Sequence, residues 1–150
     1  MAAQSKIPKG WRAPTSSELT YQADPWRDTS PTKYLVVRAD FDGDKKVDEA
    51  KLLVQTDGKK FALFVFLASG STIRLDHDEV ALLQVMGIDL LPPDAYRTAC
   101  GKGYWKCEKD EPETLQLRVP GIMYFKSESA ASVFFWSPSE KKLRQVWLSD

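Results

Sequence analysis

The sequence predicts a mostly β protein, with α+β as the alternative class, in which one antiparallel β-rich domain forms a sandwich or a partly open barrel. Short apolar runs rich in β-branched and aromatic residues recur about every 10 to 15 residues and are separated by turn residues, which is typical of strands. No strand–helix–strand pattern repeats, so a parallel α/β sheet is not expected. The lack of internal repeats excludes a propeller, which needs several similar blades.

Residues 1–32 are expected to form an irregular N-terminal arm, because they are rich in Pro, Ser and Thr and show no sustained hydrophobic period. Within this arm, Thr15 and Glu18 have the spacing of a capping box, which predicts a short N-terminal helix. The arm also carries isolated aromatic residues that either dock on the domain or mark a contact surface: Trp11 and Trp26.

The β-rich domain is expected to span residues 33–150. Its first half contains four runs that predict strands: residues 34–37, 50–54, 61–67 and 72–75. Asp57-Gly58 is a typical hairpin turn between the second and third of these runs. The third run has no polar position, so we expect a central strand that is covered on both faces.

The second half of the domain begins with a segment near residues 79–87 whose apolar spacing predicts a minor helix that ends at Gly87. Pro92-Pro93 forbids any helix beyond it. The remaining apolar runs predict four further strands: residues 115–119, 122–125, 133–136 and 146–148. A polar loop over residues 137–142 separates the last two.

Charge and hydropathy exclude several classes of protein. The 150 residues contain 21 Lys and Arg and 21 Asp and Glu, so no excess of positive charge predicts nucleic-acid binding. The longest apolar run is far shorter than the roughly 20 residues that span a membrane as a helix. The first residues carry no apolar stretch of a signal peptide, so the chain is either cytoplasmic or a mature exported protein whose leader was replaced by Met.

Residues 40–49 form an acidic loop that is the most specific feature of the chain. Acidic side chains occupy loop positions 1, 3, 5 and 9, and position 7 offers a backbone carbonyl: Asp40, Asp42, Asp44, Asp48 and the carbonyl of Lys46. Calcium is bound by six to eight hard oxygen ligands, and this set with water would supply them. The spacing therefore predicts a structural Ca²⁺ site, which would fasten two neighbouring strands.

The segment from Val37 to Leu52 resembles the Asp-rich calcium loops of the FG-GAP, VCBS and dockerin-like families, in the strand-loop-strand form found in bacterial extracytoplasmic proteins. The resemblance implies a calcium site without implying a fold. Lys51 stands where an EF-hand has its bidentate Glu, which favours a shorter loop closed by Asp48. Lys45 stands where the families have Gly, and must adopt a conformation that Gly takes freely.

Two alternatives to a calcium site remain at this loop, namely a weak or vestigial site and a solvated acidic loop without an ion. Residues 40–49 contain five acidic and two basic side chains, which leaves a local charge of −3. Because like charges in one loop repel each other, a bound cation would stabilise the folded loop. The charge therefore favours the calcium site.

Cys100 and Cys107, the only two cysteines, flank a Gly-rich turn. A hairpin there would bring them within bonding distance, which predicts a disulfide, with two reduced core thiols as the alternative. A zinc site would lack ligands, because the chain has one His. A disulfide and millimolar calcium are both typical of extracytoplasmic fluids, so we expect a periplasmic or secreted protein, with a cytoplasmic one as the alternative.

No catalytic residue is predicted. Asp76 and Asp78 flank His77, but neighbouring residues of a strand point to opposite faces and cannot orient one ring together. The acidic run from Glu108 to Glu113 has no apolar surroundings that would raise a carboxyl pKa, so a solvated loop is expected.

The closing part of the chain resembles small uncharacterised exported proteins of proteobacteria, over residues 100–105, 128–130 and 146–150. We therefore expect a non-enzymatic protein that binds another protein, for example as an inhibitor or immunity protein against a secreted toxin or effector. One alternative is a hydrolase that uses acidic groups, with a pocket around Glu108, Glu128 or His77. Another is a lipid- or sugar-binding β domain, which would carry an apolar cavity.

Overall fold

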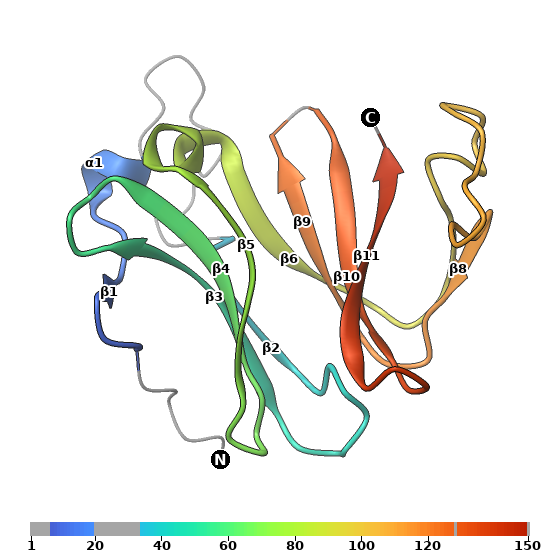
Figure 1. The fold of residues 1–150 in the computed structure, drawn as a ribbon, viewed down its shortest axis with the longest axis horizontal. Coiled ribbons are helices and arrows are strands. Elements are labelled where there is room, and N and C mark those ends of the chain that lie inside the picture. The colour runs from blue at the N-terminus through green and yellow to red at the C-terminus, as the bar shows by residue number, and fades with distance from the viewer. Residues whose placement is uncertain (1–6, 20–33, 128, 150) are drawn as a thin grey trace.

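The computed structural model describes residues 7–19, 34–127 and 129–149 (Figure 1). It confirms the mostly β class, with antiparallel sheets and two short helices, and it is not a closed barrel. Two sheets face each other as the layers of a sandwich, and a small third sheet lies outside the second (Figure 1). Among the described residues, no helix is long and apolar enough to cross a membrane.

The first sheet contains five strands: β1 (Trp11–Arg12), β2 (Val36–Ala39), β3 (Asp48–Gln55), β4 (Lys60–Phe66) and β5 (Thr72–Glu79). Strands β3, β4 and β5 follow one another as antiparallel neighbours, and the turn between β3 and β4 contains Asp57-Gly58 as expected. Two short strands share the other edge of β3. β2 pairs with residues 48–51, and β1 pairs with residues 54–55.

β4 is the central strand, buried on both faces as its sequence predicts. Phe61, Leu63 and Val65 join the core between the two sheets. The alternate residues form a second cluster on the outer face: Ala62, Phe64 and Phe66, together with Leu53 of β3. Strands that are covered on both sides have continuous apolar runs, which explains the pattern of residues 61–67.

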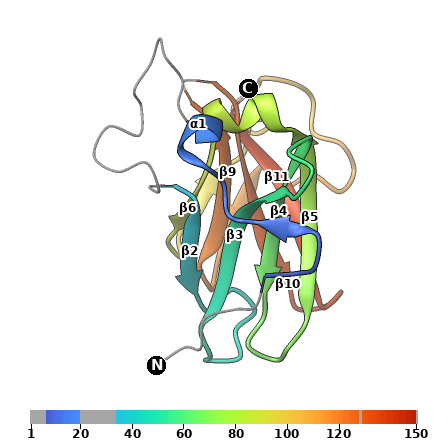
Figure 2. The same cartoon turned by 90° about the vertical axis from the view of Figure 1, so that its left-hand side faces the viewer.

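Trp11 docks on the outer face of the first sheet, which the N-terminal segment crosses in Figure 2. Its ring meets that of Phe64 edge to face at 4.9 Å between centroids, a favourable arrangement of two aromatic rings. Of the two possibilities for the aromatic residues of the arm, docking therefore holds for Trp11. Trp26 lies outside the described residues, and the division into arm and domain stays a prediction.

Helix α1 (Ser16–Leu19) is the short helix predicted from the capping box. The backbone N–H of Thr15 donates to the Glu18 carboxylate at 2.9 Å, which forms one half of that motif. The same carboxylate accepts two hydrogen bonds from the Arg12 guanidinium, at 2.8 and 2.9 Å, and this pairing lowers the pKa of Glu18 to about 2. The capping residue of α1 is thereby tied to β1.

The second sheet contains four strands in the order β11, β10, β9, β6: β6 (Met86–Leu91), β9 (Gly121–Lys126), β10 (Ala131–Ser137) and β11 (Lys142–Ser149). β6 was not predicted. The expected helix near 79–87 is a six-residue 3-10 helix, η1 (Val80–Val85), and Gly87 lies inside β6 instead of ending a helix. Pairing with β9 outweighs the local helical spacing. The Ile88 backbone N–H also donates to the Tyr34 carbonyl at 2.8 Å, which joins β6 to the residues just before β2.

The third sheet pairs β7 (Ala95–Arg97) with β8 (Thr114–Gln116). It covers part of the outer face of the second sheet, where Leu115 and Leu117 pack against Val133 and Val146. β7 was not predicted, and the expected strand over residues 115–119 ends at Gln116. A strand of three residues, such as β7, carries too few positions to show an alternating pattern in the sequence.

Candidate metal centre

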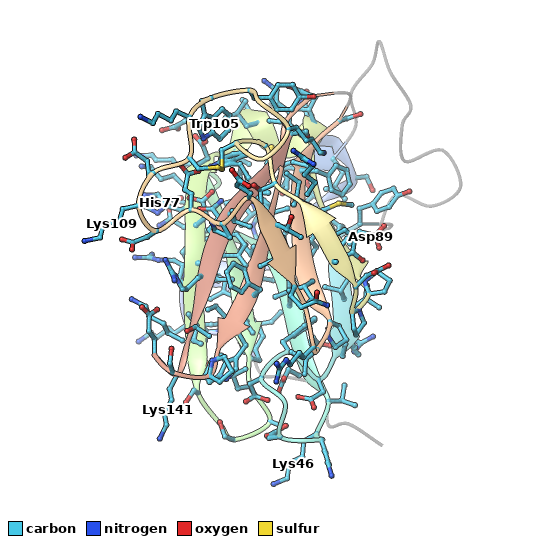
Figure 3. The ribbon with its side chains drawn as sticks, turned by 90° about the vertical axis from the view of Figure 1, so that its right-hand side faces the viewer. Lys46, His77, Asp89, Trp105, Lys109 and Lys141 are labelled. Atoms are coloured by element: carbon cyan, nitrogen blue, oxygen red, sulfur yellow. A yellow bond between two sulfur atoms is a disulfide. The ribbon has the colours of Figure 1, made fainter. Side chains whose placement is uncertain are left out.

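The predicted calcium loop connects β2 to β3, and Ala39 pairs with Asp48 at its base. Figure 3 labels Lys46 at this end of the molecule and Trp105 at the opposite end. One carboxylate oxygen from each of four residues lies within 4.8 Å of the others: Asp40, Asp42, Asp44 and Asp48. The fold thus brings together all four predicted acidic ligands, and their cluster could hold a metal ion.

Asp40 organises the loop by accepting backbone hydrogen bonds. Gly43 and Asp44 donate to its Oδ1 atom at 2.8 and 3.2 Å, and Lys45 donates to Oδ2 at 2.8 Å. Burial alone would raise the pKa of Asp40, but these N–H donors together outweigh burial and lower it. Lys45 has a φ of 67°, so it adopts the left-handed conformation that the sequence required of it.

Asp48 is the most buried member of the cluster, with 1% of its surface exposed. Its Oδ2 atom accepts the backbone N–H of Phe41 at 2.8 Å, and its Oδ1 atom accepts that of Ala68 at 2.8 Å. Phe41 is itself part of the core between the sheets. One carboxylate therefore ties the loop to the core and to the segment that follows β4, two contacts that the sequence analysis missed.

Negative charge accumulates inside the cluster. Burial and the charge of Asp48 raise the pKa of Asp42 to about 6, although a hydrogen bond from the Asp44 backbone opposes the rise. Among the described residues, neither Lys45 nor Lys46 forms an ion pair with the four carboxylates. A divalent cation at this position would stabilise the ionised form of all four groups.

The fifth predicted ligand is the backbone carbonyl of Lys46. The backbone N–H of Lys46 donates to Asp44 Oδ1 at 2.9 Å. This hydrogen bond fixes the peptide group between Lys45 and Lys46, which precedes the predicted carbonyl ligand. Participation of the Lys46 carbonyl itself stays a prediction. Within the described ranges, the four Asp residues form the only group of three or more acidic, His or Cys side chains close enough to share an ion.

Cys100 and Cys107 form a disulfide, with their Cα atoms 5.0 Å apart, as the sequence predicts. The bond closes part of the long connection between β7 and β8. Gly101 is required there, because a Cβ atom at this position would lie 2.0 Å from the carbonyl oxygen of Glu113. The connection is also fastened to β11, since Ala99 donates to the Trp147 carbonyl at 2.8 Å.

Removing the disulfide with the double substitution Cys100→Ser and Cys107→Ser should lower the free energy of unfolding by about 2–3 kcal/mol, because the loop it closes is short. Urea unfolding of the variant and of the wild-type protein, with and without reductant, measures this difference. The wild type in reductant should match the variant. Equal stability of the variant and the oxidised wild type would contradict the expectation.

The residues considered for catalysis lie apart from this cluster. His77 is exposed on β5, opposite Ala62 of β4. Glu111 in the acidic run accepts the Trp105 indole N–H at 3.1 Å and the Glu108 backbone N–H at 2.9 Å, so it holds its own loop. Glu128 lies outside the described residues.

We compared the chain with protein-family models, with curated proteins and with solved structures, and none of them matches it. The resemblance of residues 37–52 to Asp-rich calcium loops therefore stays a prediction, which rests on the loop itself.

Proposed function

We propose that this chain is a calcium-stabilised, non-enzymatic protein of the periplasm or the extracellular space, and that it acts by binding another protein. The observation that carries the proposal is the convergence of Asp40, Asp42, Asp44 and Asp48 within 4.8 Å at the base of two paired strands. A cation held there would fasten β2 to β3 and, through Asp48, to the segment after β4.

The ligand chemistry favours calcium over other metals. All four side chains offer hard carboxylate oxygens, and the loop contains no His or Cys, which zinc sites normally use. Magnesium demands near-ideal octahedral geometry and is usually bound by one or two carboxylates with several waters. A loop with four carboxylates fits the larger and less demanding Ca²⁺ ion.

The proposed compartment rests on the disulfide together with this loop. Disulfides persist in oxidising environments and are rare in the cytosol. Extracellular calcium modules work at dissociation constants of about 10⁻⁴–10⁻³ M. Weak binding of this order fits the acidic loop, because Lys45 holds a left-handed conformation that is unfavourable for a residue other than Gly. Both features fit a periplasmic or secreted protein. An inhibitor or immunity protein against a secreted toxin is one concrete form of such a binding protein.

Calcium titration by calorimetry, with thermal melts in calcium and in excess chelator, tests the metal site. Binding at ten to one hundred times the dissociation constant should stabilise the fold by about 1.4–2.7 kcal/mol, a rise of several degrees in Tm. Asp44→Ala should abolish both the heat of binding and the rise in Tm. A magnesium titration should give a much smaller response.

The matched control is Asp57→Ala. Asp57 accepts a backbone hydrogen bond from Lys59 at 2.9 Å, as Asp44 does from Lys46, but it lies in the hairpin turn between β3 and β4. This variant should respond to calcium as the wild type does. A wild-type protein without binding heat and without a chelator-dependent Tm would refute the calcium site.

A further inference from the structure

A surface cleft of about 570 Å³ lies where the acidic loop meets the end of β10. One wall contains Asp42 and Gly43 of the loop, and residues 116–119 lie next to it. A Cβ atom on Gly43 would lie 3.6 Å from Val119 Cγ1, so the loop packs against this segment. We call this feature the loop cleft. Figure 3 labels Lys46 of the acidic loop and Lys141, in the turn after β10, at the same end of the molecule.

The larger part of the loop cleft is apolar. Five apolar side chains line it: Leu117, Val119, Phe135, Trp136 and Pro138. Leu117 is buried, whereas the other four keep part of their surface exposed. Two of the five are aromatic, and an aromatic ring offers a flat apolar surface for the carbon skeleton of a ligand. The volume also lies within the range of about 300–1,000 Å³ that is typical of small-molecule sites.

Polar side chains with free hydrogen-bonding groups lie beside these rings. Gln116 and Arg118 are exposed and line the loop cleft. Within the described part of the chain, no residue forms a hydrogen bond or an ion pair with either side chain, and none accepts the indole N–H of Trp136. Because a buried or half-buried indole N–H usually has an acceptor, a ligand oxygen is the expected partner of this donor.

The mixed lining indicates the class of ligand. Asp42 and Arg118 are its one acid and its one base, so the lining has no excess of either charge that would select a strongly charged ligand. A lipid chain would cover Gln116 and Arg118 without offering them hydrogen bonds, which costs binding free energy. Hydroxyl groups both donate and accept hydrogen bonds, so a neutral ligand with several hydroxyls and one apolar face meets both parts of the lining. A sugar ring has these properties.

We propose that the loop cleft binds a neutral saccharide. The apolar face of a sugar ring packs on the aromatic wall formed by Phe135 and Trp136, and its hydroxyl groups form hydrogen bonds with Gln116 and Arg118. This site goes beyond the proposed binding of another protein, because its ligand is a small molecule that no partner protein has to supply.

Saturation-transfer NMR with neutral disaccharides, carried out on the full chain in calcium, tests the proposal. The probes are cellobiose, chitobiose, maltose and mannobiose. At least one of them should receive saturation from the protein and bind with a dissociation constant of about 1 mM or less. The same sugar should shift the indole N–H resonance of Trp136, which the substitution Trp136→Phe identifies.

Two exposed polar side chains of the cleft can be shortened without disturbing the core. Arg118→Ala should weaken binding of the sugar about tenfold, and Gln116→Ala severalfold, because each variant loses hydrogen bonds to the ligand. Arg74→Ala is the matched control, since it removes an exposed arginine of β5 that does not line the loop cleft. Its affinity for the sugar should equal that of the wild type.

Several results would overturn the proposal. One is the failure of all the disaccharides to receive saturation, and another is an affinity that neither Arg118→Ala nor Gln116→Ala changes. A shift confined to the indole resonances of other tryptophans would place the sugar elsewhere on the protein. Sodium decanoate serves as the probe for a lipid chain, and saturation of decanoate in place of the sugars would show an apolar-chain site instead.

Calcium titration of the same protein separates this inference from the calcium site. An intact calcium response without sugar binding would refute the loop cleft alone. Sugar binding without any calcium response would refute the calcium site alone.

Discussion

Replacing Asp48 with alanine is expected to lower the free energy of unfolding by about 3–5 kcal/mol, even after calcium has been removed by a chelator. Its two carboxylate oxygens accept the backbone N–H groups of Phe41 and Ala68, and the side chain is 1% exposed. Hydrogen bonds to a charged acceptor contribute about 1.5–3 kcal/mol each, and alanine would leave both donors without a partner. Asp48 therefore has a structural role that does not need the metal.

Urea unfolding in chelator measures this effect, with Asp44→Ala as the comparison. Asp44 accepts its backbone bond at the exposed end of the loop, so its substitution should cost stability mainly when calcium is present. Asp48→Asn keeps one acceptor oxygen and should fall between the wild type and Asp48→Ala. A loss in chelator that is no larger for Asp48→Ala than for Asp44→Ala would contradict the metal-independent role of Asp48.

Replacing Glu49 with alanine is expected to lower the free energy of unfolding by about 3–5 kcal/mol, because it leaves a buried charge unpaired. Glu49 pairs with Arg38 and, at 3.1 Å, with Lys51. The side chains of Glu49 and Lys51 are 7% and 10% exposed, so Lys51 without its partner would hold a positive charge away from water.

Lys51→Met is the informative control for Glu49. This substitution removes the buried cation and keeps its apolar stem, while Glu49 retains Arg38, so stability should change by less than about 1.5 kcal/mol. Thermal and urea unfolding of both variants measure the difference. A Lys51→Met variant as unstable as Glu49→Ala would mean that the pair itself, and not the unpaired charge, determines the loss.

Local sequence patterns predicted most strands and the acidic loop. The continuous apolar run of β4 and the turn at Asp57-Gly58 are short-range signals, and the four Asp residues lie within nine positions of one another. Backbone geometry over so few residues leaves little freedom, so spacing alone was sufficient to bring the carboxylates together. The two cysteines were predictable for the same reason.

Features that depend on distant partners could not be predicted in this way. β6 has an ambiguous sequence and becomes a strand because β9, more than thirty residues later, pairs with it. The hydrogen bond from the Ala68 backbone N–H to Asp48, 20 residues away, likewise joins segments whose approach is decided by tertiary packing. The packing of Leu115 in β8 against Val133 in β10 is likewise encoded by no local pattern.

The last strand of the first sheet, β5, has a consequence for solubility. Arg74, Asp76, Asp78 and Glu79 place charges along this edge strand, where another chain would have to bury them to continue the sheet. Charged edge strands are a common protection against edge-to-edge aggregation. The two acidic neighbours of His77, considered above in the context of catalysis, thus help to keep this edge of the first sheet from pairing with other chains.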